Sequence, residues 1–434
     1  MVKALVNATI YDHDTFRKDV YVLFEKQIFE VGPMSEFINH DYEIYNCDNS
    51  VVIPNFVLSH THIYSAFARG LSVSFNPQNF QEILDQLWWK LDRNIDADIT
   101  FASGIVYGSE CLKRGITTII DHHASGIDIY GSLQSLKRAI TDTVGLRGCY
   151  CFETSDRFDT DLCIRENLDF SLANKTSHAR GLFGLHASMS LSEETLKKVA
   201  SQLKDAPIHI HVAESKMDQD KCYENYGETI IQRLDRHGLL NPGSLLIHCV
   251  HVNDHDLRII KERNCAIVVN VTSNLNNGVG LPNIKKMLDM GIRVMVGNDG
   301  LSASVTNEYQ NIYYLNHHTS ESPLGFAMSD IEYMLEDSYL YANNLFNVRL
   351  GRIAPKYEAD FQIVPYTPPT PMTQANAFSH LFYGLFDSFR PKHVFVGGDQ
   401  ILKDYRLEKA VETLYSAAEN QAEILWNRIK QEEK

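Results

Sequence analysis

The sequence predicts an α/β protein: a (β/α)8 TIM barrel that carries a small composite β-sandwich domain built from both chain ends. Residues 55–351 repeat a unit in which a short apolar run precedes a longer stretch with helical periodicity. About eight such units over ~300 residues is the usual size of this barrel. The two chain ends instead carry short segments that alternate apolar and polar residues, which is typical of antiparallel strands.

The barrel prediction depends on eight apolar runs of strand length. These runs are 52–58, 116–121, 146–152, 181–186, 208–212, 245–250, 266–271 and 293–296. Helical patterns separate them, for example at 192–203, 227–236 and 254–263. A doubly wound sheet of six or seven strands is the alternative. No GxGxxG motif follows the first run, however, so a dinucleotide-binding fold has little support.

The β domain is predicted from strand-like segments at both ends of the chain. They lie at 4–10, 20–24 and 28–31, and again at 359–364 and 393–396, where Gly397-Gly398 marks a turn. The N-terminal group is too short to bury a core alone, so we expect it to pair with the C-terminal group.

These patterns divide the chain into three parts. We assign residues 1–54 and 352–406 to the composite β domain and residues 55–351 to the barrel. Residues 407–434 are predicted as a C-terminal helix, because their apolar residues recur every three or four positions along one stripe. We expect this stripe to pack on the barrel or across a subunit interface, which allows a homodimer.

Composition and charge limit the classes of partner. Hydrophobic residues make up 44% and charged residues 22% of the 434 residues, as in a soluble globular protein. The formal net charge of −15 argues against nucleic acid and anionic membranes, since both require a basic face. No charged-then-apolar leader, membrane-spanning run or CxxC motif is found, and the eight cysteines have no framework-like spacing. We therefore expect a cytoplasmic protein with reduced thiols and a small-molecule substrate.

Polar residues stand at the ends of several predicted strands, where TIM barrels carry their active sites. The first strand ends in His60-Thr61-His62, and residues two apart on a strand point the same way, so both imidazoles face one side. Later strands add His209, His211 and Glu214 at the fifth, His248 at the sixth and Asp299 at the eighth. Each residue alone fits a core histidine or a surface loop. Together they indicate a transition-metal site, because imidazole and carboxylate groups are its usual ligands.

These motifs resemble those of a known family. HTH after the first strand, HxHxxE at the fifth, a histidine at the sixth and NDG at the eighth are similar to the amidohydrolase superfamily. Within it, the chain resembles the branch of cytosine, guanine and S-adenosylhomocysteine deaminases and chlorohydrolases. The likeness spans nearly the whole chain and includes the C-terminal segment LGRIAPKYEADFQIV. The runs SHTHIYSAFARGL, LWWKLD, TTIIDHHAS and GLHASMSLS are still more similar to the SsnA-type aminohydrolases linked to selenium metabolism.

The resemblance implies one divalent metal ion per chain. Its ligands would be His60, His62, His211 and Asp299. Three imidazoles and a carboxylate suit zinc, and also ferrous iron, and they leave a position open for catalysis. The fourth strand ends in His186, where some superfamily members have a lysine that bridges two metals, so we expect a mononuclear site.

The resemblance also implies roles in catalysis and substrate binding. Asp299 would accept a proton from the metal-activated water, Glu214 would protonate the ring nitrogen of the substrate, and His248 would hydrogen-bond the attacking hydroxide. His186, Arg69 and one of His122 and His123 are expected to contact the substrate. Trp88 and Trp89 could stack on a planar ring, but we expect them to pack in the core, and we expect His209 to be an interior neighbour of the ligands.

Several functions fit such a site. The first hypothesis is a hydrolase of C–N bonds other than peptide bonds that releases ammonia from an amino-purine-like or amino-pyrimidine-like ring. The alternatives are hydrolytic opening of a cyclic amide or amidine, a chlorohydrolase, and a catalytically inactive relative that serves as a scaffold. Glu214 counts against the chlorohydrolase, because a leaving chloride needs no proton. The sequence leaves open the identity of the ring, zinc versus iron, and the oligomeric state.

Overall fold

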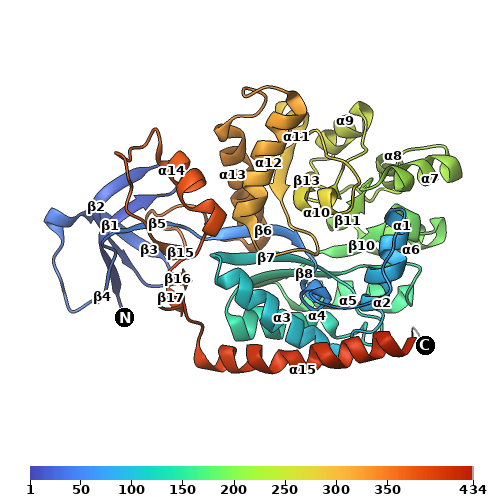
Figure 1. Cartoon of the computed structure of the whole chain (residues 1–434), viewed down its shortest axis with the longest axis horizontal. Coiled ribbons are helices and arrows are strands. Elements are labelled where there is room, and N and C mark those ends of the chain that lie inside the picture. The colour runs from blue at the N-terminus through green and yellow to red at the C-terminus, as the bar shows by residue number, and fades with distance from the viewer. Residues whose placement is uncertain (433–434) are drawn as a thin grey trace.

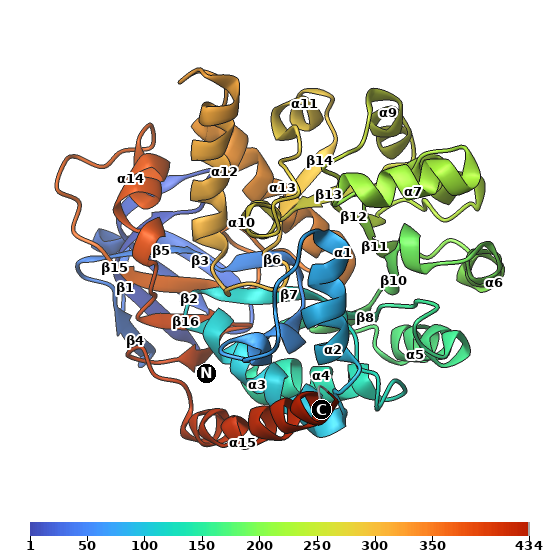
Figure 2. The same ribbon diagram turned by 45° about the vertical axis from the view of Figure 1, so that its right-hand side comes forward.

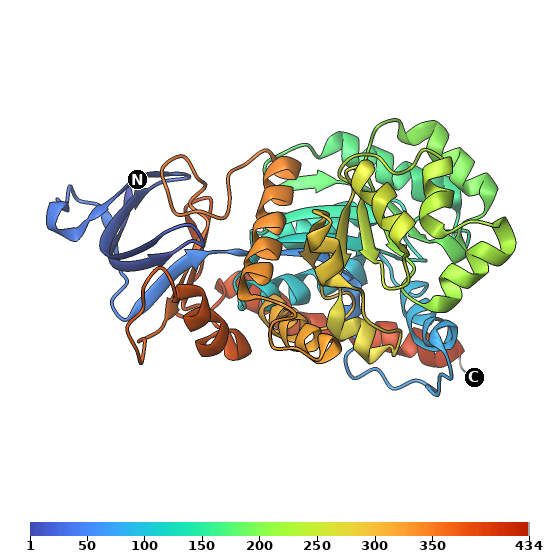
Figure 3. The ribbon, with the colours of Figure 1, turned by 90° about the horizontal axis from the view of Figure 1, so that it is seen from above.

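The computed structural model describes residues 1–432 as a barrel flanked by a β domain. Figure 1 shows the β domain at one side of the barrel and the long C-terminal helix α15 (Lys409–Glu432) running beneath the barrel. Seen from above in Figure 3, the chain passes from the β domain into the barrel along one extended segment. The two parts of the molecule are therefore joined side by side.

Strands from both chain ends form one sheet in the β domain. The strands are β1 (Lys3–Tyr11), β2 (Phe16–Phe24), β3 (Ile28–Pro33), β4 (Glu43–Asn46), β5 (Ser50–Pro54), β15 (Phe361–Pro365), β16 (His393–Val396) and β17 (Asp399–Leu402). Their order is β17-β16-β15-β5-β1-β2-β3, and β4 also pairs with β1. The two ends meet where β5 pairs antiparallel with β15, Val52 lying opposite Ile363. The prediction of a β domain built from both ends is confirmed.

Parallel strands close into a barrel in the rest of the chain. Within residues 1–432 these eight strands are β6 (Phe56–Thr61), β7 (Ile116–His123), β8 (Arg147–Phe152), β10 (Phe183–Ala187), β11 (Ile208–Val212), β12 (Leu245–His248), β13 (Ala266–Val269) and β14 (Arg293–Val296). Strands β6 to β8, extended by the short β9 (Ala179–Gly181), pair in one arc, and β10 to β14 pair in a second. Parallel bridges from Thr154 to Leu185 and from Thr61 to Asp299 join the two arcs. The barrel is thereby closed.

The first predicted strand, at 52–58, is in fact two strands. Its apolar run is divided at Asn55, whose side-chain amide donates a hydrogen bond of 2.7 Å to the Phe395 carbonyl. Pro54 cannot donate a ladder hydrogen bond, so β5 ends there and stays in the β domain. The barrel begins only with β6. The other seven predicted strands overlap observed ones, and 208–212 and 293–296 match β11 and β14 in full.

Helices cover the outside of the barrel, as Figure 2 shows. They are α3 (Ala97–Leu112), α4 (Ser132–Lys137), α5 (Thr160–Ala173), α6 (Glu193–Leu203), α7 (Lys216–Tyr226), α8 (Ile230–Arg236), α9 (Asp254–Glu262), α10 (Val271–Asn276), α11 (Ile284–Asp289), α12 (Val305–Ser320) and α13 (Met328–Phe346). Three more helices lie outside this series: α1 (Phe80–Ile83), α2 (Trp89–Asp92) and α14 (Ala377–Gly384). Short polar side chains cap several of them. Asp96, Ser192 and Asn253 each accept hydrogen bonds from first-turn N–H groups.

The C-terminal helix packs on the barrel, which is one of the two places expected for it. Its buried stripe consists of Val411, Ala418, Leu425 and Ile429, and it lies against α3. Trp426 Nε1 donates to the Phe67 carbonyl at 2.7 Å, and Arg428 forms an ion pair of 2.6 Å with Asp96. The helix therefore holds the segments on either side of α2.

The eight cysteines are all buried and all free of disulfides. Buried thiols of this kind behave as small apolar side chains. No helix in residues 1–432 is both long and apolar enough to cross a membrane.

Candidate functional site

A pocket opens at the C-terminal ends of the barrel strands. It encloses about 680 Å³, part of it open to solvent. Its lining residues are His62, Tyr64, Phe80, Leu84, Trp88, Trp89, Asp92, Glu153, His186, Ala187, Met189, His211, Glu214, Asp218, Asn277, Asp299 and Gly300. This is the end of the barrel at which the sequence predicts the chemistry.

Four side chains converge at the base of this pocket. His60 and His62 come from the end of β6, His211 comes from β11, and Asp299 follows β14. One potential ligand atom of each lies within 4.8 Å of the corresponding atoms of the other three. The structure thus brings together the four residues that the sequence predicts as metal ligands.

Hydrogen bonds to the backbone decide which imidazole nitrogens face this centre. His62 Nδ1 lies 2.7 Å from the His122 carbonyl, and His211 Nδ1 lies 2.8 Å from the His186 carbonyl. Because a carbonyl can only accept, both Nδ1 atoms carry a hydrogen. The two Nε2 atoms then present lone pairs to each other across 3.1 Å. This contact is repulsive unless a proton or a metal ion lies between the two nitrogens, so the arrangement fits a bound metal ion.

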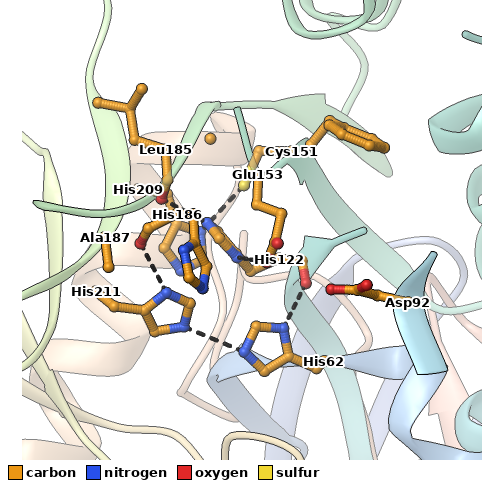
Figure 4. A network of polar contacts seen from close by, with 12 residues as sticks. His62, Asp92, His122, Cys151, Glu153, Leu185, His186, Ala187, His209 and His211 are labelled. Atoms are coloured by element: carbon orange, nitrogen blue, oxygen red, sulfur yellow. Dashed lines mark hydrogen bonds and ion pairs between the residues drawn. The ribbon is translucent and has the colours of Figure 1, made fainter. Parts of the chain in front are cut away.

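His60 is oriented by a neighbouring histidine. Its Nδ1 lies 2.9 Å from Nε2 of His209, whose Nδ1 is 3.4 Å from Cys151 Sγ. Figure 4 shows His209 and Cys151 above His62 and His211 in this view. Burial lowers the pKa of His60 to about 3, so its imidazole is neutral and can ligate. His209 is the interior neighbour that the sequence predicts, and it also holds a ligand in place.

Asp299 supplies the negative charge of the centre. Its Oδ1 lies 3.1 Å from His62 Nε2, and the Ser273 hydroxyl donates to its Oδ2. Burial acts to raise its pKa, but the nearby imidazoles of His60 and His62 hold that pKa well below its usual range. The same contact raises the pKa of His62 to about 9 in spite of burial. A divalent cation would take the place of the proton on His62, since metal and proton compete for the same lone pair.

Glu214 and His248 stand beside the proposed ligands. Glu214 Oε2 is 3.5 Å from His248 Nε2, and Asn277 Nδ2 donates to Glu214 Oε1 at 3.2 Å. His248 Nδ1 in turn lies 2.7 Å from the Asn274 side-chain oxygen. Burial raises the pKa of Glu214 above that of an ordinary glutamate. A carboxyl group with a raised pKa retains a proton closer to neutral pH, which suits a general acid.

Four backbone positions at or just after the strand ends adopt the left-handed conformation. They are Ala213, His248, Cys249 and Asp299, with φ values of 46°, 70°, 50° and 56°. For residues other than glycine this conformation costs ~1–3 kcal/mol and persists only where the surroundings impose it. Such residues cluster at functional sites, and here each one lies at or next to a candidate catalytic group.

Only some of the residues predicted to contact the substrate line the pocket. His186 lines the pocket, with its Nδ1 2.6 Å from Ser190 Oγ. Trp88 and Trp89 also line it, and Trp88 packs against the hydrophobic core as well, so the expectation of core packing holds for Trp88 while both residues border the pocket. The predicted substrate contact of Arg69 is not supported by the structure. Its guanidinium forms an ion pair of 2.8 Å with Glu110, and its side chain is 59% exposed.

The two histidines after the second strand lie behind the pocket wall. His122 and His123 are fully buried, and neither belongs to the lining. His122 Nε2 donates to the Leu185 carbonyl at 3.0 Å, and the His122 carbonyl holds His62. The structure therefore supports a positioning role for His122 in place of a substrate contact.

Several lining residues escape prediction from the sequence. Glu153 directly follows the third barrel strand, and Asp299 likewise follows the eighth. Its position at a strand end could therefore have predicted that Glu153 lines the pocket. Asp92, Asp218 and Asn277 belong to segments outside the strands, and their positions depend on how those segments fold back over the barrel mouth.

We predict that the protein binds close to one metal ion per chain. His211→Ala should weaken the binding of zinc by at least ~10²-fold. This loss exceeds the usual effect of removing a residue that only hydrogen-bonds to a metal ligand. Elemental analysis after dialysis measures this, with exposed His255→Ala as the matched control.

Atoms of His62, His122 and Glu153 also lie within 4.8 Å of one another. His62 Nδ1 donates its hydrogen to the His122 carbonyl, however, so we expect no second tight site. Two tightly bound metals, or full occupancy in His211→Ala, would contradict this.

Comparison with known proteins adds the family context. A model described as "Amidohydrolase family" matches residues 51–401. The chain is 25% identical over 423 residues to a 5'-deoxyadenosine deaminase of Methanocaldococcus jannaschii, which covers 94% of this chain and 97% of the relative. It is 26% identical over 437 residues to a 5-methylthioadenosine/S-adenosylhomocysteine deaminase of Caldanaerobacter subterraneus, covering 97% of each. The crystal structure of an adenosine deaminase from Xanthomonas campestris with bound zinc superposes with a TM-score of 0.82 and 17% identity, covering 98% of each chain.

Proposed function

We propose that this protein, which belongs to the amidohydrolase family, is a metal-dependent aminohydrolase that replaces an exocyclic amino group of a nitrogen heterocycle with oxygen. One observation carries the proposal. Glu214, a buried carboxyl group with a raised pKa, lies beside Asp299 and His248 without belonging to the four-residue ligand cluster. Hydrolytic loss of an exocyclic amino group from an aromatic ring is assisted by an acid that protonates a ring nitrogen, and Glu214 can supply that proton.

We propose zinc as the metal. Three imidazoles and one carboxylate are a usual zinc ligand set, with room for a water molecule. When bound, a divalent cation of this kind supplies Lewis acidity and lowers the pKa of a coordinated water from 15.7 toward ~7. The zinc in the structurally similar adenosine deaminase supports the choice.

The residues of this chain then divide the work of proton transfer. Asp299, whose carboxylate stays ionised, takes a proton from the attacking water. Glu214 gives its proton to the ring nitrogen next to the carbon under attack, which makes that carbon more electrophilic. The proton that Asp299 took from the water then passes to the amino group, so the bond from carbon to the amino nitrogen breaks and ammonia leaves. His248 lies beside both carboxyl groups and, with a proton on Nε2, steadies the negative charge that develops on the attacking oxygen. His186 and the rings of Trp88 and Trp89 position the heterocycle.

We propose an amino-purine as the substrate class. The relatives are deaminases of 5'-deoxyadenosine and of 5-methylthioadenosine and S-adenosylhomocysteine, all of which carry adenine. Ring opening of a cyclic amide would use the same groups, whereas loss of chloride would leave the proton of Glu214 without a use. The setting in selenium metabolism, the cytoplasmic location and a homodimer stay predictions from the sequence.

Ammonia release tests the proposed function. Zinc-loaded protein should release ammonia from at least one member of a panel of amino-purines, amino-pterins and amino-pyrimidines, and a chelator should abolish the reaction. An enzyme-coupled assay measures ammonia directly, and boiled protein serves as the blank. If every amino-heterocycle stays intact while a cyclic amide or a chlorinated ring is consumed, the proposal fails.

A further inference from the structure

One wall of the pocket consists of charged groups that the proposed mechanism does not use. Glu153 follows β8, Asp92 ends α2, and Arg157 lies between them. Both carboxylates line the pocket, yet their residues are only 1% and 2% exposed. We call Asp92, Glu153 and Arg157 the acidic wall.

Within the acidic wall, one cation serves two buried acids. Arg157 Nη2 lies 2.5 Å from Asp92 Oδ2 and 3.0 Å from Glu153 Oε1. The guanidinium stacks on the rings of Trp89 and Phe158, each 4.7 Å from ring centroid to Cζ, so it cannot easily move toward either acid. A single positive charge therefore faces two carboxyl groups.

Buried hydrogen-bonding groups in and beside this wall lack partners within residues 1–432, and one of them is the donor Arg157 Nε. Asp92 Oδ1 is buried and has no hydrogen-bond partner within residues 1–432, and the same holds for His122 Nδ1. His122 Nδ1 lies 3.7 Å from Glu153 Oε2. Figure 4 shows the carboxyl groups of Asp92 and Glu153 beside His62 and His122, close to the metal centre. Buried acceptors without donors are costly, so a donor from a bound molecule would stabilise them.

The whole pocket shares this negative character. Its described lining contains five carboxyl side chains and neither lysine nor arginine; the acids are Asp92, Glu153, Glu214, Asp218 and Asp299. Glu214 is proposed to carry a proton, and Arg157 and a divalent metal would offset three of the four remaining charges. An anionic substituent would then meet carboxylates with no basic side chain to pair with.

We propose that the acidic wall determines substrate specificity: Asp92 and Glu153, held by Arg157, accept hydrogen bonds from N–H or O–H groups on the part of the substrate remote from its reacting amino group. The substrate is thus an uncharged or cationic heterocycle, and forms bearing a phosphate or carboxylate are rejected. This inference rests on the proposed function, because that function seats the ring over the metal centre.

Equilibrium binding tests this without requiring turnover. Calorimetry at pH 8 would compare adenosine with adenosine monophosphate, and cytidine with cytidine monophosphate, on zinc-loaded protein that carries Glu214→Gln throughout, so that the ligand is not consumed. For two like charges about 8 Å apart at an effective dielectric constant of about 20, the phosphorylated member should bind at least ~30-fold more weakly. Adenine, which lacks the sugar, shows whether sugar hydroxyls or ring N–H groups are the donors.

Substitutions assign the effect to the wall. Asp92→Asn and Glu153→Gln each remove one charge with little change in shape. Each should therefore reduce the difference in affinity between the phosphorylated and the uncharged ligand of a pair by ~10-fold, and should weaken binding of the uncharged ligand. Exposed Asp205→Asn, at the opposite end of the barrel before β11, should change neither value. Zinc content and thermal midpoint check that each variant is folded, and Glu153→Gln carries the test if Asp92→Asn is not.

Three results would overturn the inference. The first is equal affinity for the phosphorylated and the uncharged ligand of a pair when Asp92 and Glu153 are both present. The second is an unchanged difference in affinity in the folded Asp92→Asn and Glu153→Gln variants. The third is failure of every uncharged ligand to bind. Failure of the proposed function looks different, because uncharged rings would still bind in preference to phosphorylated ones while no ammonia appears. Conversely, ammonia release together with tight binding of phosphorylated rings would overturn this inference alone.

Discussion

Glu214→Gln should lower kcat by at least ~10²-fold while zinc content stays at the wild-type value. The glutamine amide is nearly isosteric and can keep the contact with Asn277, but it cannot deliver a proton at neutral pH. An acid needed only in the transition state affects kcat and kcat/KM alike, and substrate binding should change far less. Steady-state kinetics with parallel metal analysis measures all three quantities.

The pH profile gives this prediction a second readout. Because burial raises the pKa of Glu214, the active protonated form persists to higher pH, and activity should fall as pH rises through that pKa. Glu214→Gln should lose this falling limb. Turnover near the wild-type rate would show that Glu214 is not the acid, and would favour a reaction whose leaving group needs no proton.

Asp299→Asn should reduce kcat by at least ~10³-fold and also lower metal occupancy, because the substitution removes a ligand and the proton acceptor together. The expected difference from Glu214→Gln lies in the metal. Asparagine also loses the negative charge that faces His62 Nε2 at 3.1 Å. Metal analysis and kinetics at increasing zinc separate the two defects.

Excess zinc should restore occupancy of Asp299→Asn without restoring turnover, since no proton acceptor remains. Ser273→Ala offers the matched control, because it removes only the hydroxyl that donates to Asp299 and should cause a milder loss of both properties. Full activity of Asp299→Asn after zinc loading would show that another group accepts the proton.

Much of the barrel is readable from sequence because its strands are buried on both faces. In the run 208–212, every residue other than its two histidines is apolar, and the run forms β11 with the same bounds. The break between β5 and β6 is not readable, because both strands are apolar and their separation depends on where distant strands pair. Closure of the barrel likewise depends on contacts between Thr61 and Asp299, which are far apart in sequence.

The candidate metal ligands were predictable because they stand on strands or soon after a strand ends, where the geometry of the strand fixes the direction of the chain. His60 lies on β6 and His62 follows it directly, so two positions separate them. Residues on loops lack such a constraint. Arg69 lies only seven positions after His62 yet turns away to Glu110, whereas Asp92, farther along the chain, returns to the pocket.

The mass of the product formed in water labelled with the heavy oxygen isotope tests the central claim most directly. Incubation of the zinc-loaded protein with the best substrate, followed by mass spectrometry, shows which bond is broken. Deamination predicts a product that has lost its amino group as ammonia and gained one labelled oxygen in its place. A product that has gained a whole labelled water and kept its nitrogen would establish ring opening and contradict the proposed deamination.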